Sequence, residues 1–201
     1  MKVGYDVIID EDTVFKNTDF TEIGNHCAID KGFYCTTKFK IGNYVHISPY
    51  VTCIGGKDSS FEAFGFNNIM AGARIICCSD RFDDSGLFGA MIPKKHKGKQ
   101  INSPIIMENF SNIGTNSIVL PGSILREGVL LTAGSLLMGD TEKWGVYKGN
   151  PAKLVKKIDV DLAQGKVLLA YDKGIEIVFE DIQNKILANG INAIKMQILV
   201  I

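Results

Sequence analysis

Apolar residues recur at every sixth position over most of this chain, and no other feature restricts its fold as strongly. We call these the anchor positions. In a first block they are Ile23, Ile29, Cys35, Ile41, Ile47 and Cys53, and in a second they are Ile101, Met107, Ile113, Val119, Leu125, Leu131 and Leu137. Every anchor is apolar, although only 46% of the chain is hydrophobic. A short fixed period of this kind indicates a solenoid built from repeated units.

The residue four places after an anchor is usually small. These residues are Cys27, Val45, Val51, Ser111, Ser117, Ser123, Val129 and Ser135. A large apolar side chain at each anchor would fill a corner of a narrow prism, and the small residue would fit the tight turn beside it. Three hexads would make one triangular coil, and coils would stack through parallel strand pairing. The pattern therefore predicts an all-β protein, a parallel β-helix of hexapeptide repeats.

The hexapeptide frame is interrupted at three places. Ile9 and Phe15 lie in a different phase from the first block, and Ile75 lies in a third phase that requires an insertion between residues 57 and 62. A longer excursion, polar and then basic, runs from about residue 78 to residue 103. Insertions leave a solenoid as loops, and loops frequently carry function. The excursion is therefore the first place to look for functional residues.

The hexapeptide pattern stops after residue 157. We expect a β-helix domain over residues 1–157, which includes the excursion, and a mostly helical cap over residues 158–201. In the cap, apolar residues such as Ile182 and Ile186 follow a helical spacing. A cap of this kind would cover the open end of the solenoid, which otherwise invites edge pairing.

Composition narrows the class of protein. The chain has 201 residues, and its 22 Lys and Arg balance its 22 Asp and Glu. Zero net charge argues against a general nucleic-acid or anionic-membrane binder. The sequence has neither an apolar run of about 18 residues, which a membrane span would need, nor the apolar stretch of a signal peptide. We therefore expect a soluble, cytoplasmic protein without a nucleic-acid or membrane partner.

Cysteine and histidine spacing does not predict a metal site. The cysteines are Cys27, Cys35, Cys53, Cys77 and Cys78, and the histidines are His26, His46 and His96. The five cysteines fit neither a disulfide framework nor a zinc knuckle, so we interpret them as buried, reduced thiols. A zinc site of three histidines would need a closer grouping. We therefore expect no metal cofactor.

The repeat resembles that of the hexapeptide acyltransferases over about Val7 to Lys157. The resemblance implies a left-handed parallel β-helix and a homotrimer whose active sites lie between adjacent subunits. The family also includes carbonic-anhydrase-like members and non-catalytic scaffolds. A scaffold therefore stays open as an alternative.

The segment from Trp144 to Lys153 resembles the exit segment of coenzyme-A-dependent transferases, which lies near the adenosine and phosphate end of the acyl donor. Gly149 would let backbone N–H groups approach a phosphate, while Lys148 and Lys153 would supply charge. The resemblance also implies that small residues of the last coils, Gly114 and Ala133, contact the pantetheine arm through their backbone. We expect acetyl-CoA or another acyl-CoA as co-substrate. These residues are the candidate cofactor-binding set: Gly114, Ala133, Lys148, Gly149 and Lys153.

The run around Ser79 and Asp80 resembles a variant found among N-acyltransferases that modify nucleotide-linked amino sugars, where an aspartate contacts the sugar amine. A neutral amine is already nucleophilic, whereas a hydroxyl needs help with deprotonation. Asp80 would orient the amine and stabilise its developing charge, and Ser79 would assist by hydrogen bonding. Two residues depart from the relatives. Met70 stands where some carry a serine, and Arg81 replaces a common acidic residue and would pair with Asp80 or with a substrate phosphate.

The sequence thus predicts an acyl-CoA-dependent N-acyltransferase, acetyl being the favoured group, that acts on a nucleotide-linked deoxyamino sugar for surface polysaccharide or glycan synthesis. The first alternative is a sugar O-acetyltransferase in which His96 is the general base. The second is a non-catalytic hexapeptide scaffold, which would not bind acyl-CoA. The candidate catalytic residues are Asp80, Ser79 and His96.

Overall fold

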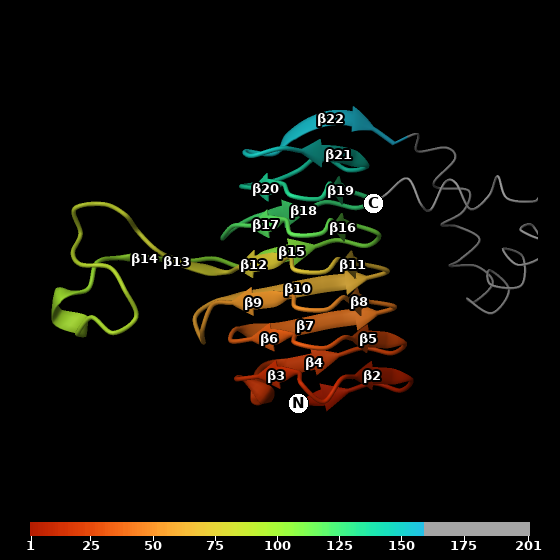
Figure 1. Ribbon diagram of the computed structural model, residues 1–201, viewed down its shortest axis with the longest axis horizontal. Helices are drawn as coiled ribbons and strands as arrows, with labels where there is room; N and C mark the ends of the chain where they lie inside the picture. The colour runs from red at the N-terminus through yellow and green to blue at the C-terminus, as the bar shows by residue number, and fades with distance from the viewer. Residues whose placement is uncertain (159–201) are drawn as a thin grey trace, which may run out of the picture.

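The computed structural model describes residues 1–158 as a parallel β-helix with three faces (Figure 1). Sheet A contains β1 (Lys2–Val3), β4 (Thr21–Ile23), β7 (Lys38–Asn43), β10 (Ser60–Gly65), β15 (Ile105–Met107) and β18 (Ile124–Leu125). Sheet B contains β2 (Val7–Ile9), β5 (Cys27–Ile29), β8 (His46–Ile47), β11 (Asn68–Ile69), β16 (Asn112–Ile113), β19 (Leu130–Leu131), β21 (Gly145–Lys148) and β22 (Lys153–Lys157). Sheet C contains β3 (Val14–Phe15), β6 (Tyr34–Cys35), β9 (Thr52–Ile54), β12 (Arg74–Ile76), β17 (Ile118–Val119) and β20 (Leu136–Leu137). The predicted all-β fold class is confirmed.

Anchors of successive coils lie in register and form columns along the inside of the prism. In sheet B, Ile47 pairs with Ile69, Ile69 with Ile113, and Ile113 with Leu131. All four are fully buried. Burying a side chain of this size stabilises the fold by about 1.5–3 kcal/mol. The apolar period therefore supplies both the core and the register of the coils.

One predicted anchor is wrong. Ile101 is 43% exposed and lies outside the prism, on β14 (Gln100–Asn102). There it pairs with Ser79 of β13 (Cys78–Asp80) in an antiparallel ladder. The coil resumes only at β15, where Ile105 and Met107 point inward and are fully buried. The hexapeptide period alone does not distinguish the returning strand of a hairpin from the first strand of a coil.

The small positions of the repeat are buried as expected. Ser111, Ser117 and Ser123 have no exposed surface. Their hydroxyl groups do not go unpaired, because each donates to a carbonyl at a nearby corner; that of Ser117, for example, donates to the carbonyl of Thr132 at 2.9 Å. A buried hydroxyl with a partner avoids the cost of an unsatisfied donor. The serines therefore fit both the size and the polarity of the turns.

The excursion leaves the coils as an antiparallel hairpin whose stem is β13 and β14, and it projects away from the three sheets (Figure 1). It contains the short helix η2 (Lys94–His96). Two smaller insertions occur at the same corner of the prism, between sheet C and sheet A. They are the segment with helix η1 (Thr18–Phe20) before β4 and the turn between β9 and β10. This C–A corner is thus where the chain departs most from a plain solenoid.

The last coil ends in a second antiparallel pair, β21 with β22, stacked on sheet B. The predicted helical cap over residues 158–201 lies outside the described residues, apart from residue 158 itself. Within residues 1–158, no helix is long and apolar enough to cross a membrane.

Candidate active site

Asp80 ends strand β13, and its carboxylate is held from two sides. Gln100 lies directly opposite on β14, and its Nε2 donates to Asp80 Oδ1 at 2.9 Å. The backbone N–H of Gly89, from the excursion, donates to Oδ2 at 2.7 Å. The Asp80 side chain is 18% exposed, so it keeps access to solvent. The excursion therefore presents one carboxylate in a fixed orientation.

These contacts also keep Asp80 ionised. The Gly89 N–H and then the Gln100 amide lower the pKa of the Asp80 carboxyl, and the nearby Lys97 ammonium adds to the effect, while partial desolvation opposes it. Because the pKa is lowered by folding, the stability that these contacts contribute is present at neutral pH and is lost as the pH falls through the lowered value. A carboxylate of low basicity suits the orientation of an amine better than the deprotonation of a hydroxyl.

The other candidate catalytic residues lie differently. The Ser79 hydroxyl donates to the carbonyl oxygen of Asp80 at 3.2 Å and is not bonded to the Asp80 carboxylate. His96 ends η2 and is exposed, and its neighbour Lys97 is the residue whose side chain lies beside Asp80. Of the two partners considered for Arg81, Asp80 or a substrate phosphate, the structure does not show Asp80, because Arg81 Nε lies 2.9 Å from Asp83 Oδ2. Asp83 follows Arg81 within the same turn and reaches it first.

Three of the candidate cofactor-binding residues come together along the corner between sheets B and C. Gly114 follows β16, Ala133 follows β19, and Gly149 follows β21, one coil above the other. A Cβ on Gly114 would lie 2.4 Å from the nitrogen of Ala133, so only glycine fits there. The Gly149 carbonyl accepts from the Leu136 N–H at 2.9 Å, which keeps it on the same corner. This B–C corner is a column of small residues, in which Gly114 is buried, Gly149 is partly exposed and Ala133 is exposed.

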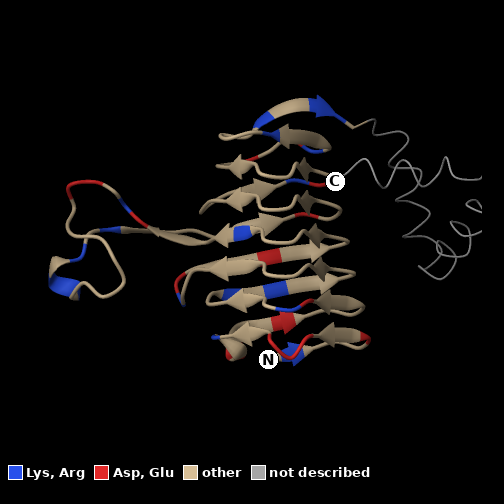
Figure 2. Cartoon of the chain, viewed as in Figure 1, with Lys and Arg blue, Asp and Glu red and all other residues tan. Residues whose placement is uncertain are grey.

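Two lysines stand at the upper end of this column. Lys148 of β21 pairs directly with Lys153 of β22, and both are exposed. Gly149, in the turn between them, has a φ of +102°, which favours glycine. Figure 2 shows basic residues on β22 and on η2 of the excursion. The Gly149 N–H donates to Ser135 Oγ at 3.1 Å, so the two exposed lysines are what this end of the column offers an anionic ligand.

The Asp80 hairpin and the B–C column do not meet within one chain. The hairpin leaves the prism at the C–A corner, and the column lies at the B–C corner, so the width of sheet C separates them. The structure therefore brings the candidate residues together in two groups, one on each side of this sheet.

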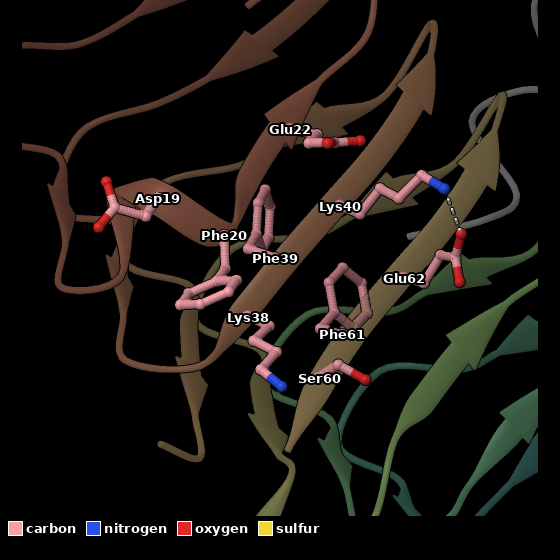
Figure 3. A pocket seen from close by; sticks show the side chains of 9 residues that line it. All are labelled: Asp19, Phe20, Glu22, Lys38, Phe39, Lys40, Ser60, Phe61 and Glu62. Atoms are coloured by element: carbon pink, nitrogen blue, oxygen red, sulfur yellow. Dashed lines mark ion pairs between the residues drawn. The ribbon is translucent and has the colours of Figure 1, made fainter. Parts of the chain in front are cut away.

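A surface cavity of about 380 Å³ lies on sheet A, next to the C–A corner (Figure 3). Its floor carries a row of alternating charge, in which Lys40 stands in register between Glu22 and Glu62. Lys40 Nζ lies 3.2 Å from Glu62 Oε1, and Lys38 Nζ lies 5.5 Å from the centre of the Phe20 ring. Sequence reasoning missed this cavity, because its residues come from three coils and only the strand register brings them side by side.

The structure offers no metal site in residues 1–158, where no three His, Cys, Asp or Glu residues are grouped to hold an ion. His26 Nδ1 lies 2.6 Å from Asp6 Oδ2, and His46 Nε2 lies 2.9 Å from Asp30 Oδ2. All five cysteines are free thiols; four are buried, as expected, and Cys78 is partly exposed. Sequence reasoning missed Gln100 and Gly89 at Asp80, because the hairpin register brings Gln100 there and the folding of the excursion loop brings Gly89.

The chain is similar in sequence and in fold to hexapeptide-repeat acyltransferases, and comparison with known proteins confirms the resemblance seen in the sequence. The chain is 28% identical over 160 residues to the dTDP-4-amino-4,6-dideoxy-D-glucose acyltransferase of Escherichia coli, which covers 77% of this chain and 81% of the relative. No protein-family model matches the chain.

Solved structures agree with this similarity. An aspartate-to-asparagine variant of AntD, an N-acyltransferase from Bacillus cereus, solved with dTDP and coenzyme A, superposes with a TM-score of 0.78 at 26% identity, over 85% of this chain and 91% of AntD. A variant of AntD solved with dTDP-4-amino-4,6-dideoxyglucose and coenzyme A gives a TM-score of 0.77 at 27% identity, over 84% and 90%. A hexapeptide-repeat acetyltransferase from Vibrio cholerae, with a TM-score of 0.56 at 15% identity over 71% of this chain and 74% of the other, supports the fold alone. The predicted similarity to coenzyme-A-dependent N-acyltransferases of nucleotide-linked amino sugars is confirmed.

Proposed function

We propose that this protein transfers an acyl group, acetyl or a similar one, from coenzyme A to the amine of a nucleotide-linked deoxyamino sugar. The observation that carries the proposal is the fixed, ionised Asp80 carboxylate on the projecting hairpin. Among the relatives, the Escherichia coli enzyme acylates a dTDP-linked 4-amino sugar, and AntD has been solved with such a sugar and coenzyme A. A dTDP-linked 4-amino-4,6-dideoxy sugar is therefore the acceptor to test first, and the product would serve polysaccharide or glycan synthesis in the cytoplasm.

Asp80 would act on the acceptor by accepting a hydrogen bond from the amine. This contact would aim the nitrogen lone pair at the thioester carbonyl carbon. The C–N bond forms, the C–S bond breaks, and coenzyme A leaves as its thiol after taking up the proton that the amine loses. Ser79 would assist through a hydrogen bond after its hydroxyl turns away from the Asp80 carbonyl, which it contacts in the free chain.

The donor would lie along the B–C corner. Ala133 is exposed and carries no side chain beyond Cβ, so it would leave backbone accessible to the pantetheine arm, while the buried Gly114 lets the coil beneath Ala133 pack against it. Lys148, Gly149 and Lys153 would hold the phosphate end, because they combine exposed ammonium groups with a glycine turn. The extended shape of the column matches the extended shape of the donor.

A homotrimer would join the two groups of residues. The hairpin projects away from its own coils (Figure 1) and leaves the prism at a different corner from the B–C column, which we call the donor column from here on. A hairpin from one copy would therefore meet the donor column of the next, and the site would be complete only between copies. We propose three such sites in each trimer.

Met70 distinguishes this chain from AntD. Structures of AntD include variants at a serine and at an aspartate ten residues later. Ten residues before Asp80, this chain carries Met70, which lies on the B–C corner one coil below Gly114 and donates its N–H to Ile113. A thioether is a weak acceptor and cannot donate a hydrogen bond. We propose that this chain binds its acceptor without the serine hydroxyl and replaces it by an apolar contact.

The test is thiol release from acetyl-CoA with dTDP-4-amino-4,6-dideoxyglucose and with its 4-hydroxy counterpart. The wild-type protein is compared with Asp80→Asn and with His96→Ala. Release only with the amino sugar, lost in Asp80→Asn and kept in His96→Ala, supports the proposal. Release with the hydroxyl sugar that depends on His96 supports an O-acetyltransferase instead, and the absence of acyl-CoA binding supports a scaffold.

A further inference from the structure

We propose that Lys97 is a positioning residue for the acceptor, whose ammonium offsets the negative field of Asp80 so that the bound amine loses its proton and can attack near neutral pH. The inference rests on the proposed role of Asp80. The inference adds a second requirement to orientation, which is that the bound amine must be deprotonated before it can attack.

A carboxylate beside an amine has two opposing effects. It orients the amine, but it also stabilises the protonated form, because an opposite charge within a few Å favours the charged state. An ammonium group has no lone pair and cannot attack a thioester. An acceptor site built on Asp80 alone would therefore favour the protonated, unreactive form of its substrate, and a nearby cation would oppose this effect.

Lys97 supplies such a cation at a suitable distance. Its Nζ lies 3.8 Å from Asp80 Oδ1, and the two side chains are only 20% and 18% exposed. This separation is short for electrostatics but too long for a hydrogen bond. Lys97 therefore acts on Asp80 without occupying the lone pair that an acceptor amine would use.

Asp80 also retains capacity for a ligand. A carboxylate offers about four lone-pair positions. In this structure Gln100 takes one position on Oδ1 and the Gly89 N–H takes one on Oδ2. The remaining positions are open on the partly exposed side. An amine can thus join the cluster while Lys97 stays in place.

The other charged groups near the hairpin do not replace Lys97. Arg81 is engaged by Asp83, and Lys99 acts electrostatically on Asp83. The Cys78 thiol has a raised pKa, first because of burial and then because of Asp80, so it stays neutral. Asp58 acts on Cys78 from the turn before β10 and adds negative charge. Within residues 1–158, Lys97 is the cation that forms an ion pair with Asp80.

The test is the pH dependence of the single-turnover rate, with enzyme in excess over dTDP-4-amino-4,6-dideoxyglucose and saturating acetyl-CoA. The acidic limb of this profile reports the protonation of the bound amine. For Lys97→Met, we expect the limb to move upward by about one pH unit, the size expected for the loss of one partly screened charge. The rate at high pH should stay near the wild-type value, and Lys97→Arg should restore the limb.

A matched control comes from the same segment. Lys95 is exposed on η2, so Lys95→Met should leave the limb in place. A merely structural role for Lys97 would lower the rate equally at every pH. Either that result or an unmoved limb in Lys97→Met would overturn the inference.

Asp80→Asn separates failure of this inference from failure of the proposed function. An unchanged rate in Asp80→Asn would remove Asp80 from the reaction, and the role of Lys97 with it. A slow Asp80→Asn together with an unmoved limb in Lys97→Met would overturn only the inference about Lys97.

Discussion

Gln100 lies directly across the β13–β14 ladder from Asp80 and donates its side-chain amide to Asp80 Oδ1 at 2.9 Å. The register of one short hairpin therefore fixes the orientation of the carboxylate. A slip of β14 by one residue would turn the Gln100 side chain to the opposite face of the hairpin, away from Asp80. The candidate site thus depends on strand pairing outside the β-helix as much as on the coils themselves.

Replacing Gln100 should impair the reaction without disturbing the coils. Gln100→Leu keeps the side-chain volume but removes the amide donor, so the Asp80 carboxylate loses one of the two hydrogen bonds that hold it. We expect kcat to fall about tenfold, as a misdirected polar group in an active site commonly causes. The melting temperature of the β-helix, followed by circular dichroism, should not change. A wild-type kcat in Gln100→Leu would mean that this contact only shapes the loop.

The paired lysines at the end of the donor column should affect the binding of acetyl-CoA and not the binding of the sugar. Lys148→Ala with Lys153→Ala removes two exposed charges that face each other across β21 and β22. We expect the KM for acetyl-CoA to rise about tenfold, at roughly 0.7 kcal/mol for each lost charge. Steady-state kinetics measures this, and Lys156→Ala on the same strand is the control. An equal rise in the KM of the sugar would argue against the assignment.

Complementation between inactive copies tests whether the site spans two chains. One variant carries Asp80→Asn, and the other carries Lys148→Glu with Lys153→Glu. If a hairpin serves the donor column of its neighbour, a random mixture of the two in trimers should regain about one quarter of the wild-type sites. Thiol release from co-expressed, co-purified protein measures the recovery. A chain that carries all three substitutions is the negative control, and a mixture that stays inactive would place each site within one copy.

The anchor column should carry much of the stability of the fold. Ile69 is fully buried between Ile47 and Ile113, so Ile69→Ala leaves a cavity inside the prism. We expect the free energy of unfolding to fall by about 2–5 kcal/mol, measured by denaturant titration. Ile8 is 65% exposed on the same sheet, and Ile8→Ala should change stability by less than about 0.5 kcal/mol. Similar losses in both variants would contradict the assignment of the core.

Much of the β-helix could be predicted because its period is local. Each coil repeats the same turn, so Ile47, Ile69 and Ile113 reach the core wherever the frame holds. The prediction was wrong at Ile101, where the frame continues by coincidence into the return strand of a hairpin. The local spacing of apolar residues does not show how β13 and β14 pair across the excursion.

In the candidate site too, some residues could be predicted from local motifs and others could not. Asp80 and the residues of the B–C column were predicted from motifs, and the stacking of the coils explains why Gly114, Ala133 and Gly149 share one corner. Gln100 was not found, because it is recognisable only through its position opposite Asp80. Pairing between distant segments is decided by tertiary packing and leaves no short pattern in the sequence.

The most direct measurement is a crystal structure of the protein with coenzyme A and dTDP-4-amino-4,6-dideoxyglucose. We predict that the sugar amine lies within about 3 Å of an Asp80 carboxylate oxygen, the distance of a hydrogen bond. We also predict that the pantetheine arm follows the corner formed by Gly114 and Ala133 of a neighbouring copy. A sugar whose amine points away from Asp80, or a coenzyme bound away from that corner, would contradict the account.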